Sequence, residues 1–82
     1  MPREYTESKG EDDSWRIDLS VGDELDVLDE NPGIKFWCPA RVIEIELKRV
    51  KITYLDWSSK WDEWIDRSST RLAVFGTHVF RV

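Results

Sequence analysis

The residues from 54 to 64 combine aromatic rings and carboxylates at a spacing that suits cation binding. The stretch reads Tyr-Leu-Asp-Trp-Ser-Ser-Lys-Trp-Asp-Glu-Trp, and its large aromatic residues are Tyr54, Trp57, Trp61 and Trp64. Three of the five tryptophans of the chain lie here, interleaved with the acidic residues Asp56, Asp62 and Glu63. The face of an aromatic ring attracts positive charge, and a nearby carboxylate adds to that attraction. The stretch therefore predicts an aromatic cage for a cation.

The segment before this stretch indicates how its first ring is positioned. Val50, Ile52 and Tyr54 fall on alternate positions, which is the period of a β-strand, so they share one face. We therefore expect Tyr54 to lie beside core aliphatic residues, with its ring at the end of a strand. We assign Trp64 to the core, within a short strand over residues 63–66, and expect Trp37 in the core rather than in the cage.

The elements expected around these residues are short strands separated by turn signals. Val21-Gly22-Asp23 and Asn31-Pro32-Gly33 are typical turns, and Pro39 is expected to interrupt a strand as a bulge or an edge position. The Lys48-Arg49 break predicts a hairpin. The strands are expected at residues 24–29, 34–38, 40–47, 50–54 and 63–66, with a single helical turn at 67–70 and a further strand near 79–82.

This pattern predicts an all-β fold, namely a small, strongly bent antiparallel five-stranded barrel with one short 3-10 turn. We expect a disordered acidic tail over residues 1–14 and one folded domain over residues 15–82. Residues 15–20 alternate in polarity, which favours a short strand or an extended segment on which Trp15 acts as a packing plug. A barrel of this size encloses little besides its own side chains, so a ligand is expected at the rim.

Composition sets further bounds on the class of protein. The chain has 82 residues and a net charge of −5, and most of this excess negative charge lies in the first 19 residues. A near-neutral folded part lacks the basic footprint of a nucleic-acid binder. The single cysteine, Cys38, cannot form an internal disulfide, and no apolar run has the length of a membrane span. We expect a soluble, monomeric intracellular domain of a longer protein.

The sequence does not contain a recognisable catalytic or metal-binding pattern. Asp62 and Glu63 are adjacent, so in a strand they point to opposite faces and make a poor acid–base pair. One cysteine and one histidine, Cys38 and His78, do not make a zinc site, and Cys38 has no cationic neighbour to activate it. We expect His78 to be exposed to solvent. The sequence favours a binding module without a metal or cofactor over an enzyme.

The chain resembles the Royal superfamily of small barrels, which includes Tudor, chromo-barrel and malignant-brain-tumour domains. The resemblance covers about residues 20–75 and is closest to Tudor domains of the PHD-finger-20 type and to chromo barrels. It is carried by these segments: Val21-Gly22-Asp23, Trp37-Cys-Pro-Ala-Arg-Val42, Val50-Lys-Ile-Thr-Tyr54, Asp56-Trp57, Lys60-Trp-Asp-Glu-Trp-Ile65 and Ser69-Thr-Arg-Leu72.

The resemblance implies a nuclear, chromatin-associated module whose aromatic cage binds methylated lysine, usually in a histone tail. Tyr54, Trp57 and Trp61 match cage aromatics, and Asp29 matches an acid that favours lower methylation states. Trp64 matches a packing residue. Cys38 and Glu30 stand where relatives usually carry aromatic walls, and Phe36 is expected to replace one of them.

Two alternatives stay open at this point. Some chromo-barrel relatives bind RNA, and the basic residues Lys48, Arg49, Lys51 and Arg41 would give weak, salt-sensitive contacts to RNA or DNA. The other alternative is a protein-interaction barrel with an incomplete cage, which pairs the edge of its sheet with a partner strand.

Overall fold

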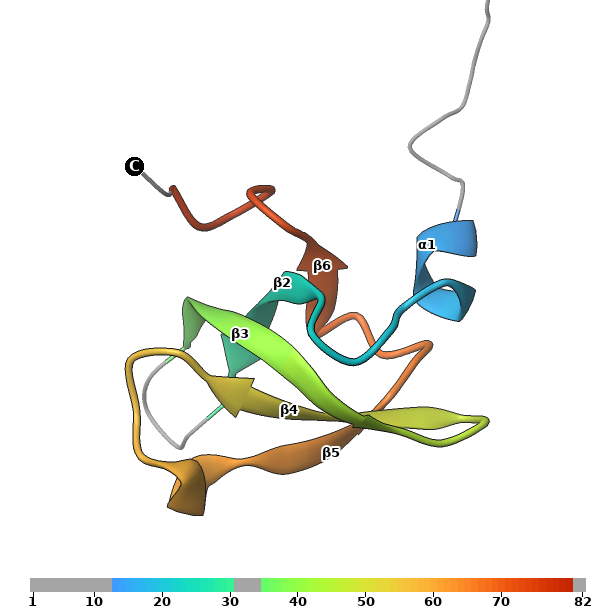
Figure 1. Ribbon diagram of the computed structural model, residues 1–82. Helices are drawn as coiled ribbons and strands as arrows, with labels where there is room; N and C mark the ends of the chain where they lie inside the picture. Colours follow the sequence, from blue (N-terminus) through green and yellow to red (C-terminus); the bar gives the residue numbers. More distant parts are fainter. Residues whose placement is uncertain (1–12, 31–34, 81–82) are drawn as a thin grey trace, which may run out of the picture.

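The computed structural model describes residues 13–30 and 35–80, which form one curled antiparallel sheet (Figure 1). The sheet has five strands in the order β5-β4-β3-β2-β6, so β5 and β6 are its edges. Its strands are β2 (Glu24–Asp29), β3 (Phe36–Ile45), β4 (Arg49–Tyr54), β5 (Glu63–Asp66) and β6 (Leu72–Val74). The expected all-β fold with five antiparallel strands is confirmed.

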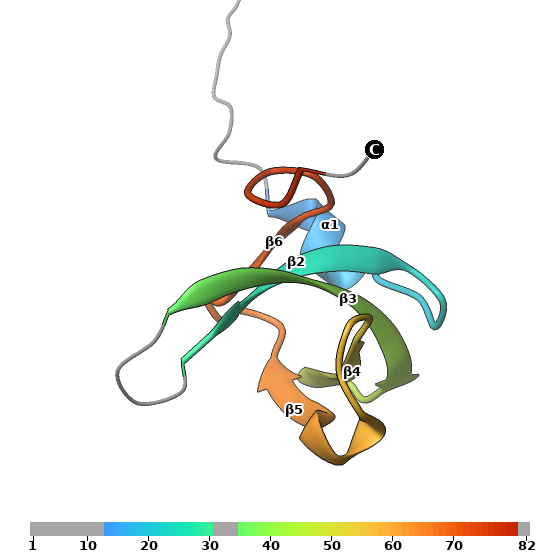
Figure 2. The same cartoon turned by 90° about the vertical axis from the view of Figure 1, so that its left-hand side faces the viewer.

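The sheet bends strongly along its longest strand. β3 pairs with β2 through its first half and with β4 through its second half, and the curvature of β2 and β3 is visible in Figure 2. Between Val42 and Glu44 the register with β4 shifts, which leaves Ile43 as an extra residue. A bulge of this kind bends its strand and increases the local twist. The sheet therefore curls into an open half-barrel.

The core lies on the concave side of this sheet. Its members are aliphatic residues of every strand together with Tyr54: Leu25, Val27, Cys38, Ala40, Val42, Val50, Ile52, Tyr54, Ile65 and Leu72. Val50, Ile52 and Tyr54 are all buried, which confirms their shared face. Trp15 and Leu19 pack against the core from outside the sheet.

The segment near residue 15, expected as a short strand or an extended segment, instead forms a helical turn, α1 (Ser14–Ile17). The prediction was wrong because long-range hydrogen bonds decide the conformation. Arg16 donates to the backbone carbonyls of Arg67 and Ser69 at 2.7 and 2.8 Å. Arg67 in return donates to the Arg16 carbonyl at 2.9 Å. Of the predicted tail over residues 1–14, Asp13 precedes this turn and Ser14 belongs to it, whereas residues 1–12 lie outside the described residues.

Pro39 does not interrupt its strand, contrary to expectation. β3 runs from Phe36 to Ile45 without a break, and Pro39 pairs in register with Asp26 of β2. The Pro39 carbonyl accepts a hydrogen bond from the Leu55 amide, just beyond the end of β4 at Tyr54. The Pro39 nitrogen therefore lies where the hydrogen-bond ladder between β3 and β4 ends. Its missing N–H costs little stability for that reason.

Two other local predictions are also corrected. Residues 67–70 form turns, whereas the 3-10 turn of the described residues is η2 (Ser59–Trp61). Residues 79 and 80 lie outside any strand, because the segment before them is held by side-chain hydrogen bonds to Asp26. The Gly22 turn forms as predicted with φ of +100°, and the predicted Asn31-Pro32-Gly33 turn lies outside the described residues.

Trp64 is not a core residue, because strand alternation gives that place to Ile65. Ile65 pairs with Val50, and both are buried, whereas Trp64 pairs with Lys51 on the opposite face. The guanidinium carbon of Arg49 lies 4.5 Å from the centroid of the Trp64 ring. Trp37 is likewise only half-buried and stacks on His78, with ring centroids 4.0 Å apart, so its expected core position is wrong as well.

Candidate cation-binding site

Tyr54, Trp57 and Trp61 form a continuous row of rings at one end of the half-barrel. The Tyr54 and Trp57 centroids are 5.0 Å apart with planes tilted by 40°. Trp57 and Trp61 follow at 6.3 Å in an edge-to-face arrangement of 72°. Tyr54 is buried, whereas Trp57 and Trp61 are 36% and 48% exposed. The row thus has a fixed base and two accessible faces.

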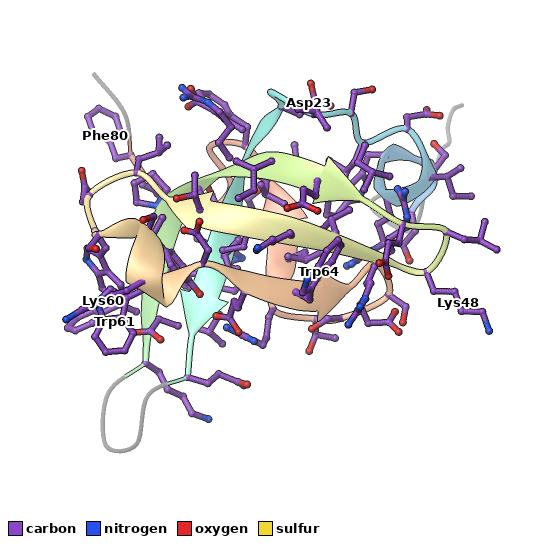
Figure 3. The ribbon with its side chains drawn as sticks, turned by 60° about the horizontal axis from the view of Figure 1, so that its bottom comes forward. Asp23, Lys48, Lys60, Trp61, Trp64 and Phe80 are labelled. Atoms are coloured by element: carbon purple, nitrogen blue, oxygen red, sulfur yellow. The ribbon has the colours of Figure 1, made fainter. Side chains whose placement is uncertain are left out.

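Local hydrogen bonds explain why the two tryptophans turn back toward Tyr54. The chain reverses as β4 ends, and the Trp57 amide donates to the Tyr54 carbonyl at 3.2 Å. Ser58 then caps η2, because its hydroxyl accepts from the Lys60 amide. This single turn places Trp61 beside Trp57 before β5 begins. Figure 3 shows Lys60 and Trp61 together at one end of the sheet, with Lys48 of the β3–β4 hairpin at the other.

The row lines a cavity of about 270 Å³ that we call the acidic hollow. Its lining residues are Asp29, Tyr54, Trp57, Lys60, Trp61, Asp62 and Glu63. Four of the predicted ligand-binding residues, the three rings and Asp29, are therefore brought together. The Lys60 ammonium lies 5.5 Å from the Trp61 centroid, so a cation of the chain itself is already placed near this ring.

A hydrogen-bonded network holds the base of the acidic hollow. The Tyr54 hydroxyl donates to Glu63 at 2.6 Å, and Arg71 donates to the same carboxylate at 2.7 and 3.1 Å. Burial of Glu63 would raise its pKa, but the hydrogen bonds from Arg71 and Tyr54 outweigh burial and lower the pKa. Burial, followed by the hydrogen bond to Glu63 and then the Glu63 charge, raises the pKa of Tyr54. The phenol is therefore neutral and fixed, and Glu63 is ionised but already paired.

The carboxylate of Asp62 differs from that of Glu63 in its hydrogen bonding. Its Oδ1 atom is buried and receives no hydrogen bond from the part of the chain that the structure describes. A buried polar atom without a partner is costly, so it is a marker for a missing donor such as a ligand N–H. The sequence analysis counted Asp62 among the acids near the rings but did not single it out as a ligand-binding residue. The sequence signal for a ligand-binding role was the position of Asp62 between Trp61 and Glu63.

Phe36 lies elsewhere, in a second cavity of about 360 Å³ that we call the aromatic hollow. Its lining residues are Phe36, Trp37, Cys38, Pro39, Tyr54, Asp56 and Trp57. Tyr54 and Trp57 line both hollows, so these cavities are neighbours. The structure thus places Phe36, 60% exposed, across from Trp57 but not among the residues that line the acidic hollow.

Cys38 gives the aromatic hollow an uncharged wall. Burial, followed by the nearby charges of Asp29 and Asp56, raises the pKa of this thiol, which therefore stays protonated. Its Sγ donates weakly to the Phe36 carbonyl at 3.7 Å. On the neighbouring wall, the exposed His78 covers one face of Trp37, with the planes 19° apart. The sequence analysis assigned Trp37 to the core and placed Cys38 and Asp56 near the expected cage without predicting a second cavity.

Three of the four basic residues considered for nucleic-acid contacts, all except Lys48, form ion pairs with acids. Arg41 bonds Glu24 at 2.9 Å and Arg49 bonds Glu46 at 2.6 Å. Lys51 lies 3.6 Å from Glu44. Phosphate binding depends on cations whose charge is not already neutralised, so these pairs reduce the electrostatic attraction of the β3–β4 hairpin for nucleic acid.

Comparison with known proteins does not identify a family for this chain. Neither family models nor curated proteins give a match to this chain. In the described residues, no helix is long and apolar enough to cross a membrane. No cluster of three or more histidine, cysteine, aspartate or glutamate side chains within residues 13–30 and 35–80 is arranged to hold a metal ion.

Proposed function

We propose that the chain is a binding module for methylated lysine in a peptide, with the methylammonium group held in the acidic hollow. The single observation that supports this most strongly is that the Tyr54–Trp57–Trp61 row lines one cavity together with the Asp62 carboxylate, whose Oδ1 has no hydrogen-bond partner among the described residues. Aromatic faces attract the charge of a methylammonium, and its methyl groups reduce the desolvation that a bare ammonium would require. An N–H of mono- or dimethyl-lysine supplies the donor that Asp62 lacks.

The charge of the hollow fits the same class of ligand. Asp29 and Asp62 line the cavity together with Glu63, whereas Lys60 is the one basic residue among its described lining residues. A basic peptide is therefore attracted by the site as a whole. Histone tails are basic and carry methylated lysines, so the proposed partner is a histone tail and the proposed location is the nucleus.

Nucleic-acid binding is less well supported than peptide binding, because Arg49 and Lys51 at the β3–β4 hairpin are paired with acids. A protein-interaction role without a cage is also less well supported, since it leaves the exposed faces of Trp57 and Trp61 beside an acidic cavity without a use.

The test is a titration with peptides that differ only in lysine methylation, followed by tryptophan fluorescence and calorimetry. Trp61→Ala is expected to weaken binding of a dimethyl-lysine peptide by about tenfold, because it removes one cation–π face worth roughly 1–2 kcal/mol. Trp57→Ala is expected to weaken binding at least as much, since Trp57 contacts both other rings.

Trp64→Ala is the matched control, because it removes the same kind of ring from a face that does not line the hollow. It is expected to leave affinity unchanged at a temperature where thermal unfolding shows all variants to be folded. Unchanged affinity in both the Trp57 and Trp61 variants would show that the cage assignment is wrong.

A further inference from the structure

The aromatic hollow and the acidic hollow lie on a shared pair of rings. Tyr54 and Trp57 line both cavities, and their centroids are 5.0 Å apart. A ligand anchored in the acidic hollow therefore has the aromatic hollow immediately beside it. Trp57, which lines both cavities, is 36% exposed.

The linings of the two hollows differ in chemistry. The acidic hollow carries the side chains of Asp29, Asp62 and Glu63, which suit a cation. The aromatic hollow carries four rings, a proline and a thiol that burial keeps neutral, with Asp56 as its one carboxylate. Asp56 is exposed, so water screens its charge and weakens its hold on a cation. Apolar walls of this kind bind an apolar side chain, since its transfer from water is favourable.

An extended peptide can reach two neighbouring cavities that share lining residues. In an extended chain, side chains two positions apart point to the same face at roughly 6.6 Å from each other. Because Tyr54 and Trp57 line both hollows, we expect two such side chains of one peptide to reach the two linings. A single peptide can therefore fill both cavities without a turn.

We propose that the aromatic hollow is a specificity subsite for an aliphatic side chain two positions from the methylated lysine. This inference rests on the function proposed above and adds the sequence that surrounds the lysine. Phe36 is its selective residue, because it lines the aromatic hollow and not the acidic one. Trp61 is the corresponding selective residue of the acidic hollow.

The experiment uses short peptides with dimethyl-lysine, alanine beside it, and either leucine or alanine two positions away on one side or the other. For the full chain, calorimetry is expected to show that leucine on one of the two sides improves affinity about fivefold to tenfold over alanine. Phe36→Ala is expected to abolish this gain while leaving the affinity for the all-alanine peptide unchanged. Trp61→Ala is expected to weaken binding of both peptides alike.

Leu47→Ala serves as the control, since Leu47 is 89% exposed and precedes Lys48, which Figure 3 shows at the end of the sheet opposite Trp61. Equal affinity of the leucine and alanine peptides for the unmodified chain would overturn the subsite but leave the proposed function standing. Tighter binding of a second dimethyl-lysine than of leucine at that position would also overturn it. If no methylated peptide binds more tightly than its unmethylated counterpart, both proposals fail together.

Discussion

At the scale of single residues, the hollow beside Trp61 contains two acids in different states. Glu63 is engaged by Tyr54 and Arg71 and keeps the base of the cavity rigid. Asp62 presents an oxygen that accepts nothing from the residues the structure describes. Glu63 therefore supports the structure of the site, whereas Asp62 can accept a hydrogen bond from a ligand.

Asp62 predicts a preference among methylation states. Mono- and dimethyl-lysine can donate an N–H to Oδ1, whereas trimethyl-lysine has none, so the unmodified chain is expected to bind dimethyl-lysine more tightly than trimethyl-lysine. Asp62→Asn is expected to reduce affinity for dimethyl-lysine by about tenfold, because it removes a charge-assisted hydrogen bond. It is expected to leave the trimethyl-lysine affinity within a few-fold. Calorimetric titration with the two peptides checks this.

A stability measurement separates this role of Asp62 from a structural one. Removing charge from a buried oxygen without a partner is not expected to destabilise the free protein, and the free energy of unfolding is expected to stay equal or rise. A loss of stability that parallels the loss of affinity would contradict the ligand-binding role.

Glu63 predicts how stability depends on pH. Its pKa is lowered in the folded protein by hydrogen bonds from Arg71 and Tyr54, after the opposing effect of burial. A lowered folded-state pKa stabilises the fold above the unfolded value, and this contribution is lost as pH falls through the folded pKa. The free energy of unfolding is therefore expected to decrease below about pH 4.5, the ordinary value for glutamate.

Glu63→Gln is expected to lower the free energy of unfolding at pH 7 by about 1 kcal/mol, a value reduced for partial solvent exposure. It is also expected to reduce the acid slope, that is, the steepness with which the free energy of unfolding falls as the pH is lowered. Urea unfolding at several pH values between the neutral and acid limits measures both effects. An acid slope as steep in the variant as in the unmodified chain would show that the slope comes from other carboxylates, such as Asp66 and Glu46, whose pKa values are also lowered by hydrogen bonds.

At the scale of elements, the fold depends on polar side chains that tie distant segments to the sheet. Arg16 and Arg67 fasten α1 to the turn between β5 and β6. Asp26 in β2 is fully buried and accepts the backbone N–H groups of His78 and Val79 at 2.7 and 3.0 Å, and that of Gly76 at 3.2 Å. This anchor also keeps His78 against Trp37, and so supports a wall of the aromatic hollow.

Asp26→Asn is expected to destabilise the protein by about 2–3 kcal/mol, because the amide replaces one acceptor oxygen with a donor facing backbone N–H groups. Urea denaturation measures the change, and Asp18→Asn is the control for lost charge at an exposed position. Faster hydrogen exchange of the Gly76, His78 and Val79 amides is expected in the Asp26 variant alone. Equal stability of the two variants would contradict the anchoring role.

At the scale of the whole molecule, sequence patterns predicted the strands and faces that follow from alternating apolar and polar residues. They failed where polar contacts between distant segments decide the local conformation. The strand at residues 24–29, the hairpin at 48–49 and the shared face of Val50, Ile52 and Tyr54 follow from local periodicity. α1 was mistaken for a strand because Arg16 bonds residues more than fifty positions away. No local pattern contains such information.

The same distinction applies to the candidate site. The spacing of Tyr54, Trp57 and Trp61 predicted a group of rings, and the structure brings them together with Asp29. Trp64 was misassigned because a strand of four residues allows either parity until the register with β4 is known. The division into two hollows could not be predicted, because it depends on how the β4–β5 loop folds over the end of β3.

The most direct test of the account is the affinity of the unmodified chain for one basic peptide in two forms, with its lysine dimethylated or unmethylated. Calorimetry under identical salt and pH is expected to show that dimethylation increases affinity at least about tenfold, since the rings favour a weakly hydrated cation. Equal affinity for the two forms would contradict the central claim, because it would mean that charge alone, and not the aromatic row, holds the lysine.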